Sequence, residues 1–350
     1  MSWGRSRWIA VAAVVAACGG TKDAPGGAES GSGSAAAAGS AAGSNVAEAP
    51  LPGASGRTKI QELAKPKVVV MDEPKIDLPS QESFRLLDPG TGAHAVLRYG
   101  AATQPWTVTA TSELQTRHLT DGTWSAPLAI PKFGIGLTVT PDAKAPNRFG
   151  LRILPAQVST PSPEVDQRLA RWRALLAGRV VTAELDDRGQ ITSLIFNDDP
   201  TLARSSEARD ALFEALFSGV VPLPIEPVGL HASWRVVTVL RLGPAYGKQT
   251  ATYTLLERSA TRWKIHVKQQ RVAEEQRIND PKIPAGVTMD LVALFRSVET
   301  DVEIDPARRV SGGGAGSSEQ RMHIRFTKGT TNKSEQMFED TGALSSTLAP

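Results

Sequence analysis

Cys18 is the only cysteine among the 350 residues of the chain, and it directly follows the small residues Ala16 and Ala17. A thiol is the one side-chain sulfur that can act as a nucleophile and form a stable thioether. The small side chains before it would let a peptidase hold the backbone as an extended strand. This combination predicts covalent modification of the Cys18 sulfur beside a cleavage site.

The residues before Cys18 have the organisation of an exported leader. Arg5 and Arg7 form a basic head, and residues 8–17 carry no charge. This run is too short to cross a bilayer, which requires about 20 apolar residues. The pattern resembles the bacterial lipoprotein signal, with Val15 where that signal more often has leucine. The alternative is an ordinary secretory leader followed by a buried cysteine.

The resemblance implies a diacylglyceryl group on Cys18 and cleavage between Ala17 and Cys18. Two or more acyl chains anchor a protein stably, whereas one holds it only marginally. Because Gly19 rather than an aspartate follows the cysteine, the resemblance also implies sorting to the outer membrane. We therefore expect a lipid-anchored envelope protein that faces the periplasm. Its first partners would be the membrane and the lipoprotein processing and sorting machinery.

The remaining composition argues against several other classes of protein. With its only thiol acylated, the mature chain would have no disulfide, cysteine nucleophile or zinc-thiolate site. Without Arg5 and Arg7, 37 of the 39 Lys and Arg residues remain against 36 acidic residues, a net charge of +1. Charges of both signs are interspersed along the chain, so no nucleic-acid partner is predicted.

No catalytic, metal or cofactor site is predicted. The histidines are isolated, and none has the i, i+4 spacing of a helical zinc site; they are His94, His118, His231, His266 and His323. Asp186 and Asp187 are better explained as turn residues than as metal ligands, because aspartates hydrogen-bond their own backbone. Residues 312–316 lack the strand and lysine of a phosphate loop, which favours a loose hairpin tip. A hydrolase with an unrecognised site is the least favoured alternative.

The composition divides the chain into four segments. Residues 1–17 are the signal peptide, and 18–82 form a lipid-anchored linker rich in Gly, Ala, Ser and Pro. Within the linker, residues 19–56 have almost nothing large to bury and predict a flexible tether with a reach on the order of 35 Å. Residues 57–82 are expected to be stiffer, with 68–70 as a candidate edge strand. The folded body is divided into a first α+β half, 83–221, and a second β-rich half, 222–350.

Alternating apolar and polar residues predict many strands in the body. These strands are expected at 106–111, 137–140, 149–154, 180–184, 191–196, 234–240, 249–257, 263–268, 298–304 and 322–326. Residues 186–189 between two of them predict a hairpin turn, with Gly189 at positive φ. Residues 305–308 hold the corresponding place in the second half.

Two helices are predicted between the strands. The first runs from Ser162, a good N-cap, to Gly178, and the second from Ser206 to about Ser218. Residues 289–295 favour a shorter helical or turn segment. Because the order of strands, helix and aspartate turn occurs twice, we expect an α+β fold. In this fold, curved antiparallel sheets form an incomplete, duplicated barrel with packed helices.

Short motifs support a family resemblance over most of residues 83–338. They are Leu97-Arg98-Tyr99-Gly100, Pro222-Leu223-Pro224 with Pro227-Val228-Gly229 and Trp234, and Thr252-Tyr253-Thr254-Leu255. In these the chain resembles an uncharacterised family of bacterial lipoproteins, which is similar to the half-barrel carriers LolA, LolB and LppX. The resemblance implies a fold and a location, and it implies no activity. The long glycine loop and the weak repeat depart from the family pattern.

Two classes of function remain. The first is a non-catalytic envelope lipoprotein that binds a lipid or other apolar ligand in a curved-sheet cleft. Its candidate lining residues are Trp106, Trp124, Trp234 and Trp263, for which core packing is the alternative. The second class is a structural or interaction module that docks other envelope proteins through sheet edges or the basic strand faces at Lys264 and Arg325.

Overall fold

The computed structural model describes residues 68–69, 76–77, 80–120, 122–129, 132–155, 157–158, 177–195, 220–242, 245–278, 283–309, 313–329 and 332–349. These residues form strands, turns and loops, and none of them is helical. Contacts place all the described residues in one compact unit, and residues 20–65 lie outside the described residues. Cys18 and its leader also lie outside them.

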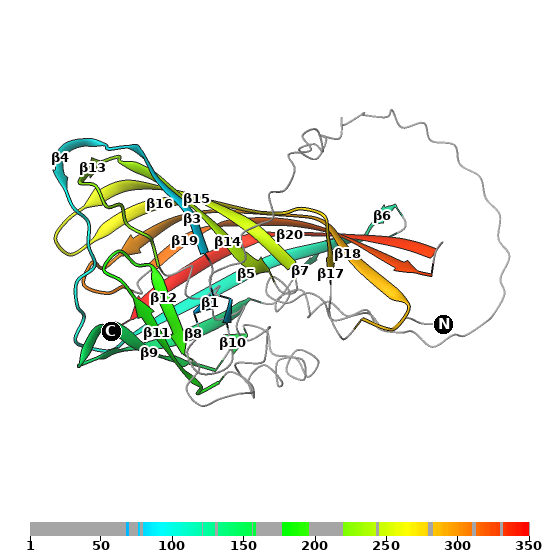
Figure 1. The fold of residues 1–350 in the computed structure, drawn as a ribbon, viewed down its shortest axis with the longest axis horizontal. Coiled ribbons are helices and arrows are strands. Elements are labelled where there is room, and N and C mark those ends of the chain that lie inside the picture. Colours follow the sequence, from blue (N-terminus) through cyan, green and yellow to red (C-terminus); the bar gives the residue numbers. More distant parts are fainter. Residues whose placement is uncertain are drawn as a thin grey trace, which may run out of the picture. The chain divides into compact units, whose positions relative to one another are not determined.

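A 16-stranded antiparallel sheet is the main feature of the fold (Figure 1). Twelve of its strands follow one another in the order β12-β11-β9-β8-β5-β20-β19-β18-β16-β15-β14-β3. Their bounds are β3 Ser80–Asp88, β5 Trp106–Thr120, β8 Phe133–Asp142, β9 Ala145–Ile153, β11 Val180–Leu185, β12 Ile191–Ile195, β14 Ser233–Leu242, β15 Ala245–Arg258, β16 Trp263–Ala273, β18 Val287–Ile304, β19 Gly313–Lys328 and β20 Asn332–Ala349.

Short strands complete the structure at the margins. Four of them pair with single strands of the main sheet: β6 Thr123–Trp124, β7 Leu128–Ala129, β10 Gln157–Val158 and β17 Gln276–Ile278. Two further pairs form separate two-stranded sheets: β1 Val68–Val69 with β2 Ile76–Asp77, and β4 Thr91–Ala95 with β13 Val228–Leu230. The strand predicted at 68–70 therefore exists, but it pairs with β2 instead of lying at the edge of the main sheet.

The two faces of the main sheet differ in chemistry because successive side chains of a strand point to opposite faces. On β16, for example, Trp263, Ile265 and Val267 are buried, while the residues between them are charged or polar and more exposed. We call these the apolar face and the charged face. The expected alternation of apolar and polar residues is thus present along the strands.

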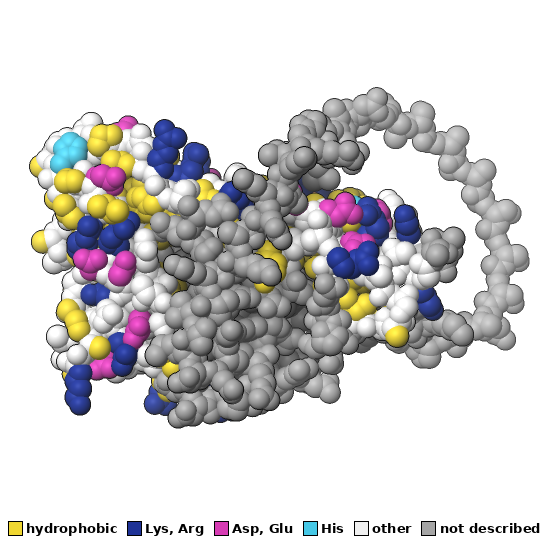
Figure 2. All heavy atoms as spheres, in the orientation of Figure 1, with side chains coloured by type: hydrophobic (Ala, Val, Ile, Leu, Met, Phe, Trp, Pro, Cys, Tyr) yellow, Lys and Arg dark blue, Asp and Glu magenta, His cyan; other side chains and the backbone are white. Residues whose placement is uncertain are grey.

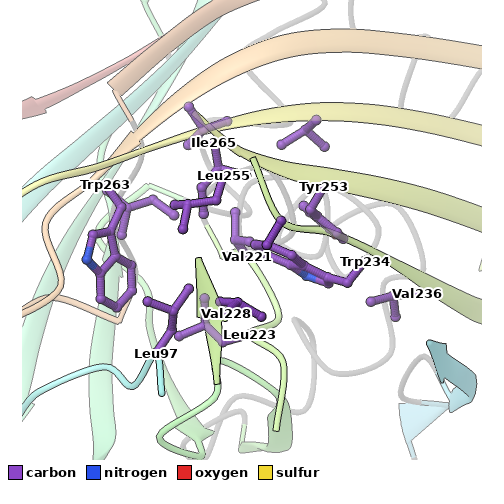
Figure 3. Close-up of a cluster of buried hydrophobic side chains, with 14 of the residues drawn as sticks. Leu97, Val221, Leu223, Val228, Trp234, Val236, Tyr253, Leu255, Trp263 and Ile265 are labelled. Carbon is purple, nitrogen blue, oxygen red and sulfur yellow. The ribbon is translucent and has the colours of Figure 1, made fainter. Parts of the chain in front are cut away.

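Among the described residues, three clusters of buried side chains belong to the core. The Trp106 cluster contains Trp106, Val108, Leu137, Val139, Phe149, Leu151, Ile153, Val181, Ala183, Leu185, Leu194 and Val220. The Trp234 cluster is drawn in Figure 3 and contains Leu97, Tyr99, Val221, Leu223, Val228, Ala232, Trp234, Val236, Ala251, Tyr253, Leu255, Trp263, Ile265, Val267, Val302 and Ile304. The Met289 cluster contains Ala245, Ala273, Ile278, Met289, Leu291 and Ile324, with Leu294, Met322, Phe326 and Phe338 partly buried against it.

The segment Leu97–Gly100 connects the two aspartate turns predicted from the sequence. The Tyr99 amide donates to the carbonyl oxygen of Asp187 over 2.8 Å, and the Gly100 amide donates to that of Pro306 over 2.7 Å. The buried Arg309 donates from Nη1 to the carbonyl oxygen of Leu185. The segment Leu97–Gly100 therefore hydrogen-bonds to both hairpin ends.

The predicted α+β class is wrong for the described residues, which are all β. The helices expected at 162–178 and 206–218 lie outside the described residues, apart from a turn at 177–178 where Gly178 has a φ of +76°. Residues 289–295 are part of β18 instead of a helix or turn. A segment of seven mostly apolar residues fits the periodicity of a helix as well as that of a strand. Here, pairing with strands on both sides selects the extended form.

The loose tip expected at 312–316 is also wrong, because β19 begins at Gly313. Its glycines permit close approach of the neighbouring backbone: a Cβ on Gly314 would lie 2.4 Å from the Asp301 carbonyl oxygen. The division of the body at 221/222 stays a prediction. In the sheet, β3 pairs with β14 and β20 pairs with β5, so strands from either side of that division are neighbours.

The first prediction concerns the hairpin between β11 and β12. Asp186 Oδ1 accepts hydrogen bonds from the backbone amides of Arg188 at 3.0 Å and Gln190 at 2.7 Å. We expect Asp186→Ala to lower the free energy of unfolding by about 1–2 kcal/mol, measured by urea denaturation, because two turn amides lose their acceptor. Asp187→Ala is the matched control: its carboxylate forms a solvent-accessible ion pair with Arg98 and attracts the Arg309 guanidinium, so the loss should be less than about 1 kcal/mol. Equal losses for the two variants would contradict the turn role of Asp186.

Candidate functional site

A row of polar side chains crosses the apolar face of the sheet. Its members are Thr116 on β5, Gln249 on β15, Arg271 on β16, Arg296 on β18, Gln320 on β19 and Asp340 on β20. Each member is the direct cross-strand partner of the next, from Gln249 through Arg271, Arg296, Gln320 and Asp340 to Thr116. We call these six residues the polar row.

Hydrogen bonds link neighbours within the polar row. Arg271 Nε donates to Gln249 Oε1 over 2.7 Å, and Gln320 Nε2 donates to Asp340 Oδ2 over 3.3 Å. Gln269, on the same strand face as Arg271, accepts from its Nε and Nη2 at 3.0 and 3.1 Å when its amide oxygen is turned toward the guanidinium. The row is therefore an ordered network of side chains.

Two charged members of the row are buried and Arg296 is half-buried, which is costly unless the charges are compensated. Arg271 and Asp340 are each only 4% exposed, and the Nε atom of Arg296 is buried. Burial and the nearby Arg296 lower the pKa of Arg271 well below its usual value. Burial also lowers the pKa of Arg296, an effect that Asp340 partly opposes, and it raises the pKa of the Asp340 carboxyl. Two arginines thus face each other with one carboxyl beyond Gln320.

The row separates two apolar surfaces on the same face. On β15, Gln249 stands between Ala251 of the Trp234 cluster and Ala245 of the Met289 cluster. On β16, Arg271 stands between Val267 and Ala273 of the same two clusters. An amphiphilic surface therefore lies on the sheet: a polar line bordered on both sides by apolar side chains.

Glycines next to the row allow the long strands to approach closely. A Cβ on Gly316 would lie 2.1 Å from the Glu299 carbonyl oxygen, and one on Gly342 would lie 2.1 Å from that of Glu113. Gly342 is two residues from Asp340, and Gly316 is four residues from Gln320, so both lie on the strand face of the row. The absence of side chains at these positions contributes to the placement of the row.

The four tryptophans predicted to line a ligand site do not form one group. Trp106 lies in the Trp106 cluster, edge-on to Phe149 at 6.1 Å between ring centroids. Trp234 and Trp263 both belong to the Trp234 cluster, where Trp234 stacks on Tyr253 at 5.7 Å and Trp263 packs on Tyr99 (Figure 3). Trp124 is 37% exposed, with the Arg117 guanidinium 4.5 Å from its ring centroid. Their packing favours the core interpretation for the three buried tryptophans.

The histidines predicted to be isolated have carboxylate neighbours in two cases. His266 Nδ1 lies 2.7 Å from Asp301 Oδ1, and its Nε2 lies 3.3 Å from Glu299 Oε1, on the charged face. His323 Nε2 lies 3.2 Å from Glu335. These partners come from adjacent strands, so the sequence alone did not reveal them. Within the described residues, no group of three or more His, Cys, Asp or Glu side chains could hold a metal ion.

The second prediction is a pH effect at the Asp301 carboxyl, which lies beside His266. The hydrogen bond with His266, together with Lys264, lowers the pKa of the Asp301 carboxyl. A carboxyl with a lowered pKa stabilises the fold above its unfolded pKa and loses that contribution as pH falls through its folded pKa. We expect Asp301→Asn to cost less than about 1 kcal/mol at pH 7, because the site is exposed, and nothing near pH 2. Urea denaturation at both pH values measures the difference.

Glu303→Gln is the control for this prediction, because Glu303 lies on the same face and its ion pair with Arg262, at 3.7 Å, is exposed on both sides. It should change the free energy of unfolding less than Asp301→Asn at pH 7. A loss from Asp301→Asn that is undiminished in acid would contradict the assignment.

The polar row was missed by sequence reasoning, although part of its signal was present. Gln249 lies on the same strand face as Ala251, Tyr253 and Leu255, within the strand predicted at 249–257. Arg271 lies on the same face as Trp263, just beyond the strand predicted at 263–268. A polar residue at an inward position is the signal that could have identified them. Their alignment across strands depends on register, which only the structure provides.

Comparisons with known proteins identify no family for the chain. Neither the family models nor the curated proteins contain a match. Among solved structures, an outer membrane channel from Pseudomonas putida F1 aligns with 71% of this chain and 98% of its own chain, at 10% identity and a TM-score of 0.14. A TM-score this low does not indicate a shared fold or a shared function. Among the described residues, no helix is long and apolar enough to cross a membrane.

Proposed function

We propose that the chain is a non-catalytic envelope lipoprotein that binds an apolar ligand, such as a lipid, on the apolar face of its sheet. The observation that supports this function best is the buried polar row between the Trp234 and Met289 clusters. Apolar residues of similar volume would commonly stabilise a core as well as buried charges do. Buried charges with shifted pKa values are instead typical of functional sites.

The ligand test uses the chain as cells produce it. We expect lipid to co-purify with the protein and to be released and identified by native mass spectrometry. We also expect a fluorescent fatty acid to bind the delipidated protein and to be displaced by the released lipid. A protein that is empty after purification and does not bind the fatty acid would exclude this function.

The lipid anchor has its own test. We expect wild-type protein to fractionate with the outer membrane, and Cys18→Ala to change that distribution because acylation is lost. Mass analysis of the native amino terminus should find an acylated Cys18. An unacylated terminus, or an unchanged distribution of the variant, would exclude the anchor without bearing on ligand binding.

A docking function is the second candidate, and exposed apolar side chains near the β4–β13 pair favour it. Leu87, Val96, Ile225 and Leu230 are each at least 39% exposed, and Leu230 pairs with Thr91 of β4. Figure 2 shows hydrophobic side chains at the surface where β4 and β13 lie in Figure 1. Crosslinking in cells should capture an envelope protein here, and Ile225→Asp with Leu230→Asp should abolish the product.

The basic strand faces predicted for docking are internally paired. Lys264 Nζ lies 3.3 Å from Asp301, and Arg325 contacts Glu335 and Glu275, each at 2.8 Å. Their charges are therefore balanced within the charged face. This balance leaves the β4–β13 region as the better docking surface.

A further inference from the structure

We infer that the surface around the β4–β13 pair contacts a bilayer with anionic head groups, into which apolar side chains insert shallowly. The inference goes beyond ligand binding on the apolar face of the sheet. It rests on the proposed lipid anchor only for the closeness of a bilayer. The surface consists of an apolar patch, Leu87, Val96, Ile225 and Leu230, and an arginine pair, Arg85 and Arg235.

Backbone contacts place part of the apolar patch at one end of the β4–β13 pair. Leu230 of β13 pairs with Thr91 of β4. A Cβ on Gly90 would lie 2.4 Å from the Leu230 carbonyl oxygen, so the turn that follows Leu87 lies against β13. Leu87 and Leu230 are therefore brought to the same end of the pair.

The rest of the apolar patch lies at the other end of the pair. Val96 directly follows β4, and Ile225 lies three residues before β13. Arg98 Nη1 donates to the Pro224 carbonyl oxygen over 2.9 Å, which holds the loop at Ile225 beside the segment after β4. Figure 2 shows Lys or Arg side chains beside hydrophobic ones where β3, β4 and β13 lie in Figure 1. Apolar side chains on such turns and loops suit shallow burial at the head-group boundary.

The arginine pair adjoins the apolar patch and indicates the charge of the bilayer. Arg85, two residues before Leu87, is the direct cross-strand partner of Arg235 on β14, and both arginines are exposed. Within the described part of the chain, neither guanidinium forms an ion pair or a hydrogen bond. Two strands further along the same row, by contrast, Lys268 Nζ lies 3.3 Å from Glu299. Since like charges in direct opposition destabilise a sheet, anionic head groups would relieve this repulsion.

Other charges beside the patch leave its net charge positive. Arg258 donates to two carbonyl oxygens of the β4–β13 pair, at 2.7 and 2.5 Å, so its charge stays at this surface. Two exposed carboxylates belong to the same turns and loops, namely Asp88, which accepts from the Gly90 amide, and Glu226. The arginine pair and Arg258 therefore outnumber them by three to two. Near an anionic bilayer each arginine should raise the affinity about fivefold.

The predicted tether favours a bilayer over a protein as the occupant of this surface. An acylated Cys18 and a tether over residues 19–56, with a reach on the order of 35 Å, would keep the body beside a bilayer. At the high effective concentration that results, a weak second contact adds strongly to the anchor. A protein partner would have to match both the apolar and the basic side chains in one arrangement, whereas fluid lipids adapt to them.

The experiment places a polarity-sensitive fluorophore on the surface and adds vesicles. The mature chain that the leader implies, from residue 18 onward, carries Cys18→Ser to prevent acylation and one new cysteine for the label. Leu230→Cys reports from the patch, and Leu128→Cys, at a leucine 46% exposed on β7, is the matched control. The vesicles are phosphatidylcholine, alone or mixed with phosphatidylglycerol. We expect a blue shift at position 230 and none at 128, with at least about tenfold higher affinity for the mixed vesicles.

Variants separate the basic from the apolar contribution. Arg85→Gln and Arg235→Gln should each weaken binding to the mixed vesicles about fivefold and leave binding to phosphatidylcholine within about twofold. Ile225→Ser should weaken binding to both kinds of vesicle about tenfold, because it removes an apolar side chain that is 60% exposed. Circular dichroism identifies any variant that fails to fold.

Arg277→Gln is the control for net charge, because it removes one positive charge elsewhere on the sheet. Arg277 lies on β17, which hydrogen-bonds to β15 at Tyr246. The segment after β13 hydrogen-bonds to β15 at Leu255, nine residues further along and therefore about 30 Å away. Arg277→Gln should change binding to the mixed vesicles less than about twofold, since most of this distance exceeds the screening length.

Three outcomes would overturn the inference. Equal affinity for the two kinds of vesicle, or an equal effect of Arg277→Gln and Arg85→Gln, would contradict the role of the arginine pair. A blue shift at position 128 as large as that at 230 would contradict the choice of surface. No binding to either kind of vesicle would leave protein docking as the use of the patch. The proposed function is tested separately, by co-purifying lipid and by mass analysis of the amino terminus.

Discussion

Trp234→Ala is expected to lower the free energy of unfolding by about 3–5 kcal/mol, the range found when a large buried aromatic is truncated. Trp234 is 0% exposed, stacks on Tyr253, and donates from Nε1 to the Pro222 carbonyl oxygen over 2.7 Å. Figure 3 shows it among side chains contributed by β13, β14 and β15 and by the loop at Val221 and Leu223. Truncation therefore leaves a cavity and an unpaired carbonyl group. Chemical denaturation of full chain measures the loss.

Two further variants make this prediction specific. Trp234→Phe keeps part of the ring contact and removes the hydrogen bond and one ring of the indole, so it should cost about 1–3 kcal/mol. Trp124→Ala removes a partly exposed ring on β6 that contacts Arg117 and should cost less than about 1 kcal/mol. Equal losses at Trp234 and Trp124 would contradict the assignment of Trp234 to the core. They would instead reopen its role as a ligand-lining residue.

Local sequence patterns predicted the strands and turns well. The hairpin of β11 and β12 follows from alternating apolar residues around Asp186 and Gly189, and Gly189 has the expected positive φ of 78°. Asp305 also forms the expected turn, accepting from the Ala307 amide over 2.9 Å. These elements depend on contacts between residues close in sequence, so they can be predicted from the sequence alone.

Features that depend on register could not be predicted in this way. Arg271 and Arg296 are 25 residues apart in the numbering and meet only because β16 pairs with β18. A shift of one residue in that pairing would send them to opposite faces. The same applies to His266 with Asp301. The helical or turn segment wrongly expected at 289–295 also hid the first part of β18, which extends through Arg296.

The second large effect on stability is expected at a glycine of β19. Two glycines of this strand, Gly313 and Gly316, should respond differently to substitution by alanine. A Cβ on Gly316 would lie 2.1 Å from the Glu299 carbonyl oxygen and 2.5 Å from the Thr300 Cβ, so the neighbouring backbone must move. We expect Gly316→Ala to lower the free energy of unfolding by about 3 kcal/mol, at the upper end of the cost of overpacking.

Gly313→Ala is the matched control at the start of the same strand. The nearest atom to a Cβ there is the Ser346 carbonyl oxygen at 3.9 Å, which is ordinary contact. Replacing a glycine in a strand then reduces the entropy of the unfolded chain, and stability should rise by about 0.5 kcal/mol. Opposite signs for the two substitutions in urea denaturation would establish that Gly316 is required by close approach of β18. A loose glycine tip, by contrast, would tolerate alanine equally at both positions.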